Sequence, residues 1–176
     1  SAWKAYRDQV DHFDKNRLNN MDKVLADLQW ASDNNKYSIF NYIFVFEQLR
    51  AIIGDEHFLP ALITDPDWIK DFCEVFTKLY IETYDYVFSN YGKPDGFFMY
   101  EELGYNHGLF CSPQMIRDLI FPFEKKFIGF LKDHGLQVIM HSCGDIRKAV
   151  PLFIEMGIDC LQPMEAKAGC DISEIG

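Results

Sequence analysis

Residues 137–145 carry the strongest structural signal in the chain and read Gln137-Val138-Ile139-Met140-His141-Ser142-Cys143-Gly144-Asp145. The stretch begins as an apolar run, typical of a buried β-strand, and ends in a histidine and a cysteine two positions apart. Residues i and i+2 of a strand point to the same face, so His141 and Cys143 should converge where the strand ends. Imidazole nitrogen and thiolate sulfur suit zinc, and Gly144 lets the backbone turn sharply afterwards. The stretch predicts a strand with a candidate metal site at its carboxyl end.

Strand-like and helix-like segments alternate along the rest of the chain. The expected strands are Tyr37–Ile43, Phe97–Tyr100, Gln137–His141 and Ile158–Gln162. The expected helices between them are Phe46–Ile53, Asp65–Tyr91, Ser112–His134 and Asp145–Met156. Asp65-Pro66 and Ser112-Pro113 each combine an N-cap residue with a proline in the first turn, which is a strong helix start. This alternation predicts a parallel α/β arrangement.

Only about four strands can be identified, whereas a closed (β/α)₈ barrel needs eight strands and typically ~250 residues. We therefore expect an α/β fold of the (β/α)₈ TIM-barrel type, of which this chain covers only about half. Residues 1–35 are expected to form an N-terminal helical segment, and residues 36–176 the partial barrel.

Composition and charge limit the classes of partner. The chain has 176 residues, of which 48% are hydrophobic and 16% aromatic, enough for one packed core. A net charge of −10 disfavours nucleic acid and an anionic membrane surface as partners. No apolar run approaches the ~20 residues of a membrane span. The five cysteines are odd in number and form no CxxC pair, which favours a reduced, cytoplasmic setting. Cys73 and Cys160 lie in apolar patterns and are expected in the core.

Polar side chains gather where the expected strands end, and in a parallel sheet or barrel that edge binds ligands. These residues are Glu101 and Glu102, then His141 and Cys143, then Gln162 and Glu165. Glu101 and Glu102 are adjacent, so at most one points into the barrel, and a bulge at the strand end would exchange them. Either is a candidate catalytic residue, as a base, a further ligand or a partner of a ligating histidine; the alternative is a solvated loop carboxylate.

The remaining candidates are substrate contacts. Gln162 and Glu165 are expected to contact substrate or to have a structural role. His107 could touch an anionic substrate or be an exposed loop histidine. His141 and Cys143 also have an alternative, in which the histidine is a hydrogen-bonded barrel residue and the cysteine a buried thiol.

An ordered set of motifs between Tyr37 and Gly176 resembles the uroporphyrinogen decarboxylase superfamily. The motifs are Gly54-Asp55-Glu56-His57-Phe58-Leu59, Thr64-Asp65-Pro66, Tyr100-Glu101-Glu102-Leu103-Gly104-Tyr105, Ser112-Pro113, Phe121-Pro122, His141-Ser142-Cys143-Gly144, and Gly157-Ile158-Asp159 to Pro163. The resemblance implies a (β/α)₈ barrel with one of two chemistries. One branch decarboxylates uroporphyrinogen without a cofactor, and the other contains zinc methyltransferases.

The His-x-Cys-Gly sequence favours the methyltransferase-like branch. That resemblance implies His141 and Cys143 as zinc ligands, with a later cysteine that would lie beyond Gly176. It also implies transfer of a methyl group between a corrinoid (cobalamin) protein and a thiol or folate acceptor. The alternatives are a uroporphyrinogen decarboxylase of porphyrin biosynthesis and a non-catalytic domain that binds a corrinoid or a partner protein.

Overall fold

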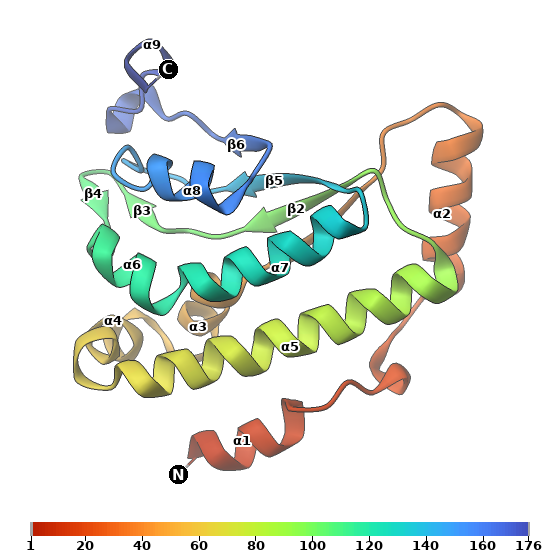
Figure 1. Ribbon diagram of the computed structural model, residues 1–176, viewed down its shortest axis with the longest axis horizontal. Helices are drawn as coiled ribbons and strands as arrows, with labels where there is room; N and C mark the ends of the chain where they lie inside the picture. The colour runs from red at the N-terminus through yellow and green to blue at the C-terminus, as the bar shows by residue number, and fades with distance from the viewer. Residues whose placement is uncertain (1, 176) are drawn as a thin grey trace.

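The computed structural model describes residues 2–175 of the protein (Figure 1). The helices are α1 (Ala2–Val10), α2 (Met21–Asp33), α3 (Val45–Ile53), α4 (Asp55–Thr64), α5 (Pro66–Tyr91), α6 (Pro113–Leu119), α7 (Phe121–Asp133), α8 (Val150–Met156) and α9 (Ile172–Ile175). The strands are β1 (Ile39–Ile43), β2 (Gly96–Tyr100), β3 (Gly104–Tyr105), β4 (Gly108–Leu109), β5 (Gln137–His141) and β6 (Cys160–Gln162). Single turns of 3₁₀ helix lie at Lys15–Arg17 and Ala166–Ala168.

The main sheet has four parallel strands in the spatial order β1-β2-β5-β6. Its register places Tyr100, the last residue of β2, beside His141, the last residue of β5. A separate antiparallel pair, β3 and β4, follows β2. The predicted parallel α/β arrangement is confirmed. Barrel closure is not seen within residues 2–175, where β1 and β6 are the edge strands of an open sheet.

The sheet has one face covered by helices and one open face. Side chains of Phe97, Met99, Val138 and Met140 are fully buried, and α5 and α7 run along this side of the sheet (Figure 1). Apart from the buried Gly96, the alternate residues of β2 and β5 point the other way and are only partly buried or exposed. This open face, with residues of β1 and β2, lines a depression of about 380 Å³.

Aromatic side chains fix the helices on the covered face. Phe44 stacks on Phe127 of α7 with ring centroids 5.0 Å apart, and Phe127 meets Phe97 of β2 edge-on at 5.4 Å. Tyr84 of α5 makes a second edge-on contact with Phe97 at 4.8 Å. Such pairs contribute roughly 0.5–1.5 kcal/mol each beyond their buried area. They hold α5, α7 and the sheet as one packed unit.

The longest helix, α5, begins as predicted at Asp65-Pro66, where the Asp65 carboxylate accepts the Trp68 N–H at 3.3 Å. One stripe of the helix is buried, including Ile69 and Phe72, while charged residues such as Glu74 face solvent. None of the described helices combines the length and the apolar character needed to cross a lipid bilayer.

The N-terminal segment packs on the outer side of α5 (Figure 1). Trp3 Nε1 donates to Asp71 Oδ2 at 2.7 Å, and Arg7 Nε pairs with the same carboxylate at 3.1 Å. The Trp3 ring also lies 5.1 Å from Phe72. The predicted boundary at residue 35 falls in the connection between α2 and β1.

The prediction of one helix over Ser112–His134 is wrong. Ser112 does cap a helix, since its Oγ accepts the Met115 N–H at 3.1 Å, but that helix, α6, ends at Leu119. Helix α7 starts again at Phe121, after Ile120 departs from regular helical geometry. Pro122 lies in the first turn of α7, where its missing N–H is tolerated; inside a continuous helix it would break the hydrogen-bond ladder.

The helix predicted over Asp145–Met156 is also shorter than expected, because α8 begins only at Val150. The Asp145 carboxylate pairs with Arg147 at 2.8 Å. The backbone N–H of Asp145 donates to the Tyr105 carbonyl, also at 2.8 Å. These contacts hold residue 145 in a loop against the β3–β4 hairpin.

The core prediction for the cysteines is half right. Cys73 is fully buried on α5, whereas Cys160 is exposed. Cys160 lies on β6, and within the described residues no strand covers the outer edge of β6.

Two carboxyl groups, Glu101 after β2 and Glu124 on α7, are fully buried. Both Glu101 oxygens accept backbone N–H groups at the start of α3, from Phe46 at 2.9 Å and Glu47 at 3.0 Å. No N–H of the described residues donates to the oxygens of Glu124. Burial raises the pKa of Glu124 to about 7 and, with repulsion from Glu124, raises the pKa of Glu101 well above its ordinary value. The pair therefore retains a proton where exposed carboxyls have lost theirs.

This pair should make folding stability depend on pH. An unfolded glutamate loses its proton near pH ~4.3, whereas folded Glu124 keeps its proton to about 7, so the free energy of unfolding should fall as pH rises between these values. The nearby thiols do not titrate in this pH range, because burial raises the pKa of Cys111 to about 12 and that of Cys73 well above its ordinary value.

Glu124→Gln supplies an N–H donor to Glu101 and should flatten that pH dependence. It should also raise the free energy of unfolding at pH ~8 by about 1–3 kcal/mol, measured by urea denaturation. Glu74→Gln, on the exposed side of α5, is the matched control. Identical pH profiles for the two variants would contradict the prediction.

Candidate metal centre

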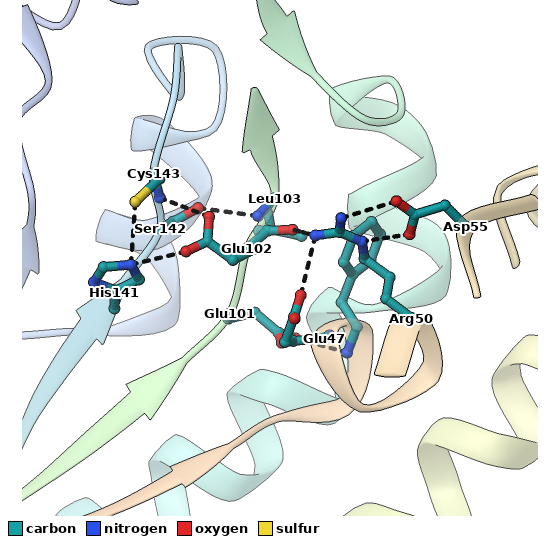
Figure 2. Close-up of polar contacts among 10 residues, drawn as sticks. Glu47, Arg50, Asp55, Glu101, Glu102, Leu103, His141, Ser142 and Cys143 are labelled. Atoms are coloured by element: carbon teal, nitrogen blue, oxygen red, sulfur yellow. Dashed lines mark hydrogen bonds and ion pairs between the residues drawn. The ribbon is translucent and has the colours of Figure 1, made fainter. Parts of the chain in front are cut away.

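Three side chains with metal-binding atoms meet on the open face, at the carboxyl ends of β2 and β5. They are Glu102, two residues past the end of β2, His141, the last residue of β5, and Cys143, two residues further on. Their ligand atoms all lie within 4.8 Å of one another. The side chains of His141 and Glu102 are 15% and 14% exposed, so the cluster is sheltered but reachable. Figure 2 shows Glu102 pointing toward His141 and Cys143.

Glu102 is the common acceptor of the cluster. Its Oε1 lies 2.8 Å from His141 Nε2, and its Oε2 accepts the Cys143 N–H at 3.0 Å. Cys143 Sγ lies 3.2 Å from the same His141 nitrogen. One imidazole nitrogen, one sulfur and one carboxylate thus face a shared point.

The His141 ring is fixed on two further sides. Tyr100 stacks on it with ring centroids 4.4 Å apart and an interplanar angle of 11°. Gln162, the last residue of β6, places its side-chain Nε2 2.8 Å from His141 Nδ1. The imidazole plane and the direction of Nε2 are therefore set before any ligand binds.

Two loops cross closely beside the cluster. Ser142 is fully buried, and its Oγ accepts the Leu103 N–H at 3.0 Å. A Cβ on Gly104 would lie 2.5 Å from the Cys143 carbonyl oxygen, and one on Gly144 would lie 2.5 Å from the Tyr105 nitrogen. Only glycine permits this approach, which keeps Glu102 and Cys143 side by side.

Glu101 and Glu102 point to opposite sides of the strand end. Glu101 faces the covered side and binds the start of α3, so it is part of the scaffold and we place Glu102 alone in the cluster. Arg50 of α3 supports this end of β2 by donating to the Glu102 carbonyl at 3.4 Å. The Arg50 guanidinium also pairs with Glu47 and Asp55 (Figure 2).

Burial and the Glu102 carboxylate raise the pKa of the Cys143 thiol to about 11. Burial and the same carboxylate raise the pKa of Tyr100. A positive charge at the shared point would counteract both influences on the Cys143 pKa, because a cation stabilises the thiolate. The local electrostatics therefore favour a cation among these three residues.

The other expected substrate contacts lie next to the cluster. The Gln162 side chain contacts His141 as described, and Glu165 Oε2 accepts the Gly144 N–H at 2.5 Å. His107 is exposed in the β3–β4 turn and, with Glu165, lines a cavity of about 640 Å³ that also contains Arg147 and Lys167. Gln162 is thus a partner of a cluster residue, while His107 and Glu165 border a neighbouring cavity.

Two residues beside the cluster escaped the sequence analysis. Tyr100 could have been found, because it shares the strand face of Glu102 by two-residue alternation. Arg50 carried no such signal, since its contact with Glu102 joins residues far apart in the chain.

Replacement of Gly144 should test the crossing of the loops. Gly144 has φ +80°, and an added Cβ would meet the Tyr105 backbone, so Gly144→Ala should lower the free energy of unfolding by about 1–3 kcal/mol. Gly129→Ala is the control, because a Cβ at this position of α7 meets nothing within 4 Å; alanine there should be neutral or stabilising by up to about 1 kcal/mol. Equal denaturation midpoints for both variants would refute the steric argument.

Comparison with known proteins shows a shared fold. No protein-family model matches the chain, and no curated protein matches it. Among solved structures, a methyltransferase from Methanosarcina mazei is similar, with a TM-score of 0.63 and 12% sequence identity. The similarity covers 84% of this chain and 44% of that protein, so the chain spans less than half of that neighbour's length. At this identity the likeness is one of fold, and the superfamily resemblance rests on the sequence motifs.

Proposed function

We propose that this chain carries the metal centre of a zinc-dependent methyltransferase that moves a methyl group between a corrinoid (cobalamin) protein and a thiol or folate acceptor. The observation that carries the proposal is the meeting of Glu102, His141 and Cys143 at the carboxyl ends of two neighbouring parallel strands. Active sites of parallel α/β folds lie at that edge.

The donor set fits zinc. Imidazole, thiolate and carboxylate are ligands that zinc accepts, and three protein ligands with an open fourth position are typical of catalytic zinc sites. Glu102 takes the third place within the described residues. Zinc bound here would lower the pKa of an incoming thiol, so that a thiolate forms near pH ~7.

The protein residues then have distinct tasks. His141 and Cys143 would hold the metal, and Glu102 would add a second negative charge beside it. The sulfur lone pair of the acceptor forms the new bond to the methyl carbon. The electron pair of the broken carbon–cobalt bond stays on the corrinoid, and the thiol proton leaves to solvent or to a carboxylate.

The solved neighbour adds support, because a protein named a methyltransferase has a similar fold. We also propose a small-molecule substrate, a corrinoid protein as partner and a cytoplasmic location. Activity that survives metal removal would favour the decarboxylase instead, and stable corrinoid binding without turnover would favour a non-catalytic binding domain.

Metal content gives the first test. The purified chain should bind about one zinc per molecule by mass spectrometry, and His141→Ala or Cys143→Ala should lower occupancy by 10- to 100-fold or more at limiting zinc. The matched controls His107→Ala and Cys160→Ala lie outside the cluster and should retain wild-type zinc. Zinc that is equally retained in all four variants would rule out this site.

Methyl transfer gives the second test. Zinc-loaded protein should catalyse thiol-dependent loss of the methyl group from methylcobalamin. The change in corrinoid absorbance measures this reaction. His141→Ala should reduce the rate to that of the thiol alone, and chelation should do the same to the wild type, because both remove the charge that stabilises the thiolate. A rate unaffected by chelation would contradict the proposal.

A further inference from the structure

Gln162 contacts the imidazole nitrogen that the metal cluster does not use. Its side-chain Nε2 lies 2.8 Å from His141 Nδ1, while His141 Nε2 lies 2.8 Å from Glu102 Oε1. Residues at three strand ends therefore fix the His141 ring. The ring belongs to β5, Glu102 just past β2 contacts its Nε2, and Gln162 at the end of β6 contacts its Nδ1.

We propose that Gln162 is a positioning residue that sets the tautomer of His141 and reverses its side-chain amide when the cluster takes up a metal. The metal-loaded half of this inference rests on the proposed function. The metal-free half rests only on the contacts of His141.

The hydrogen bonds of the metal-free site define one tautomer. An amide N–H can only donate, so Nδ1 must be the acceptor, and the ring proton of neutral His141 must lie on Nε2. That proton then points at Glu102 Oε1, which can accept it at 2.8 Å. Both contacts are satisfied only when the proton is on Nε2.

A metal ligand needs the opposite tautomer. Nε2 must present its lone pair to the metal, which moves the ring proton to Nδ1, where it needs an acceptor. A glutamine amide has a carbonyl oxygen on the same carbon as its NH₂, so half a turn about its last torsion supplies that acceptor. An aliphatic side chain supplies neither contact, and a carboxylate supplies only the acceptor.

The backbone of Gln162 is already fixed, so only its amide is free to turn. The Gln162 carbonyl oxygen accepts the Ser142 N–H at 2.9 Å, and Gln162 pairs with His141 in the strand register. Tyr100 stacked on the ring at 4.4 Å prevents the imidazole from turning instead. The moving part is therefore the Gln162 amide.

Nitrogen NMR of ring-labelled, metal-free protein tests the first half. His141 is assigned by its loss in His141→Ala, among the five histidines of the chain. The wild type should carry its ring proton on Nε2 alone, Gln162→Glu should place a proton on Nδ1 as well, because a carboxylate then faces each ring nitrogen, and Gln162→Leu should give a mixture of tautomers. Gln137→Leu, which removes the Tyr37 hydrogen bond at the start of β5, is the control and should match the wild type. An unchanged His141 tautomer in both Gln162 variants would overturn the inference.

Zinc affinity by competition with a chromophoric chelator tests the second half. Gln162→Leu should bind zinc about 10- to 100-fold more weakly, and Gln162→Glu should restore at least wild-type affinity. Equal affinities with intact zinc binding would overturn the amide reversal and leave the proposed function standing. Tautomer shifts in the Gln162 variants, together with a wild type that binds no zinc, would overturn the proposed function and leave Gln162 as the residue that orients His141.

Discussion

The register between β2 and β5 is the constraint on which the candidate site depends. Because Tyr100 pairs with His141, the Glu101 N–H donates to the His141 carbonyl at 2.9 Å and the two strand ends continue side by side. Glu102 then reaches the Cys143 N–H at 3.0 Å. A slip of one residue would turn Glu101 to the open face and Glu102 into the core, since strand side chains alternate.

Burial of Glu101 links this register to the helices. Its carboxylate satisfies two N–H groups at the start of α3 that have no partner within the helix. Arg50 on the same helix reaches back to the Glu102 carbonyl and lies 4.2 Å above the Phe110 ring. The covered side thus supports the open-face cluster, and displacing α3 would disturb Glu102 through its backbone carbonyl.

The sequence predicts the four strands of the main sheet because each is a short apolar run bounded by turn residues, and β5 has the expected bounds. The short β3–β4 pair was not predicted. The meeting of strand ends also follows from the parallel order. The choice between Glu101 and Glu102 did not follow, because the partners of Glu101 are Phe46 and Glu47, more than 50 positions away. The break between α6 and α7 was missed because apolar periodicity continues through Pro122, which hides the interruption.

Assembly of three strands is what turns these residues into a candidate metal centre. The β2–β5 pair alone brings His141 and Glu102 together, but the second contact of the imidazole comes from Gln162 on β6. Glu165, just past β6, adds a bond to the Gly144 N–H at 2.5 Å and so holds the loop that carries Cys143. Ordering β6 therefore orients the ring and the cysteine loop together. Folding already fixes the His141 ring and the loop that carries Cys143. Little conformational entropy is therefore lost when a cation binds, which favours a high affinity for the cation.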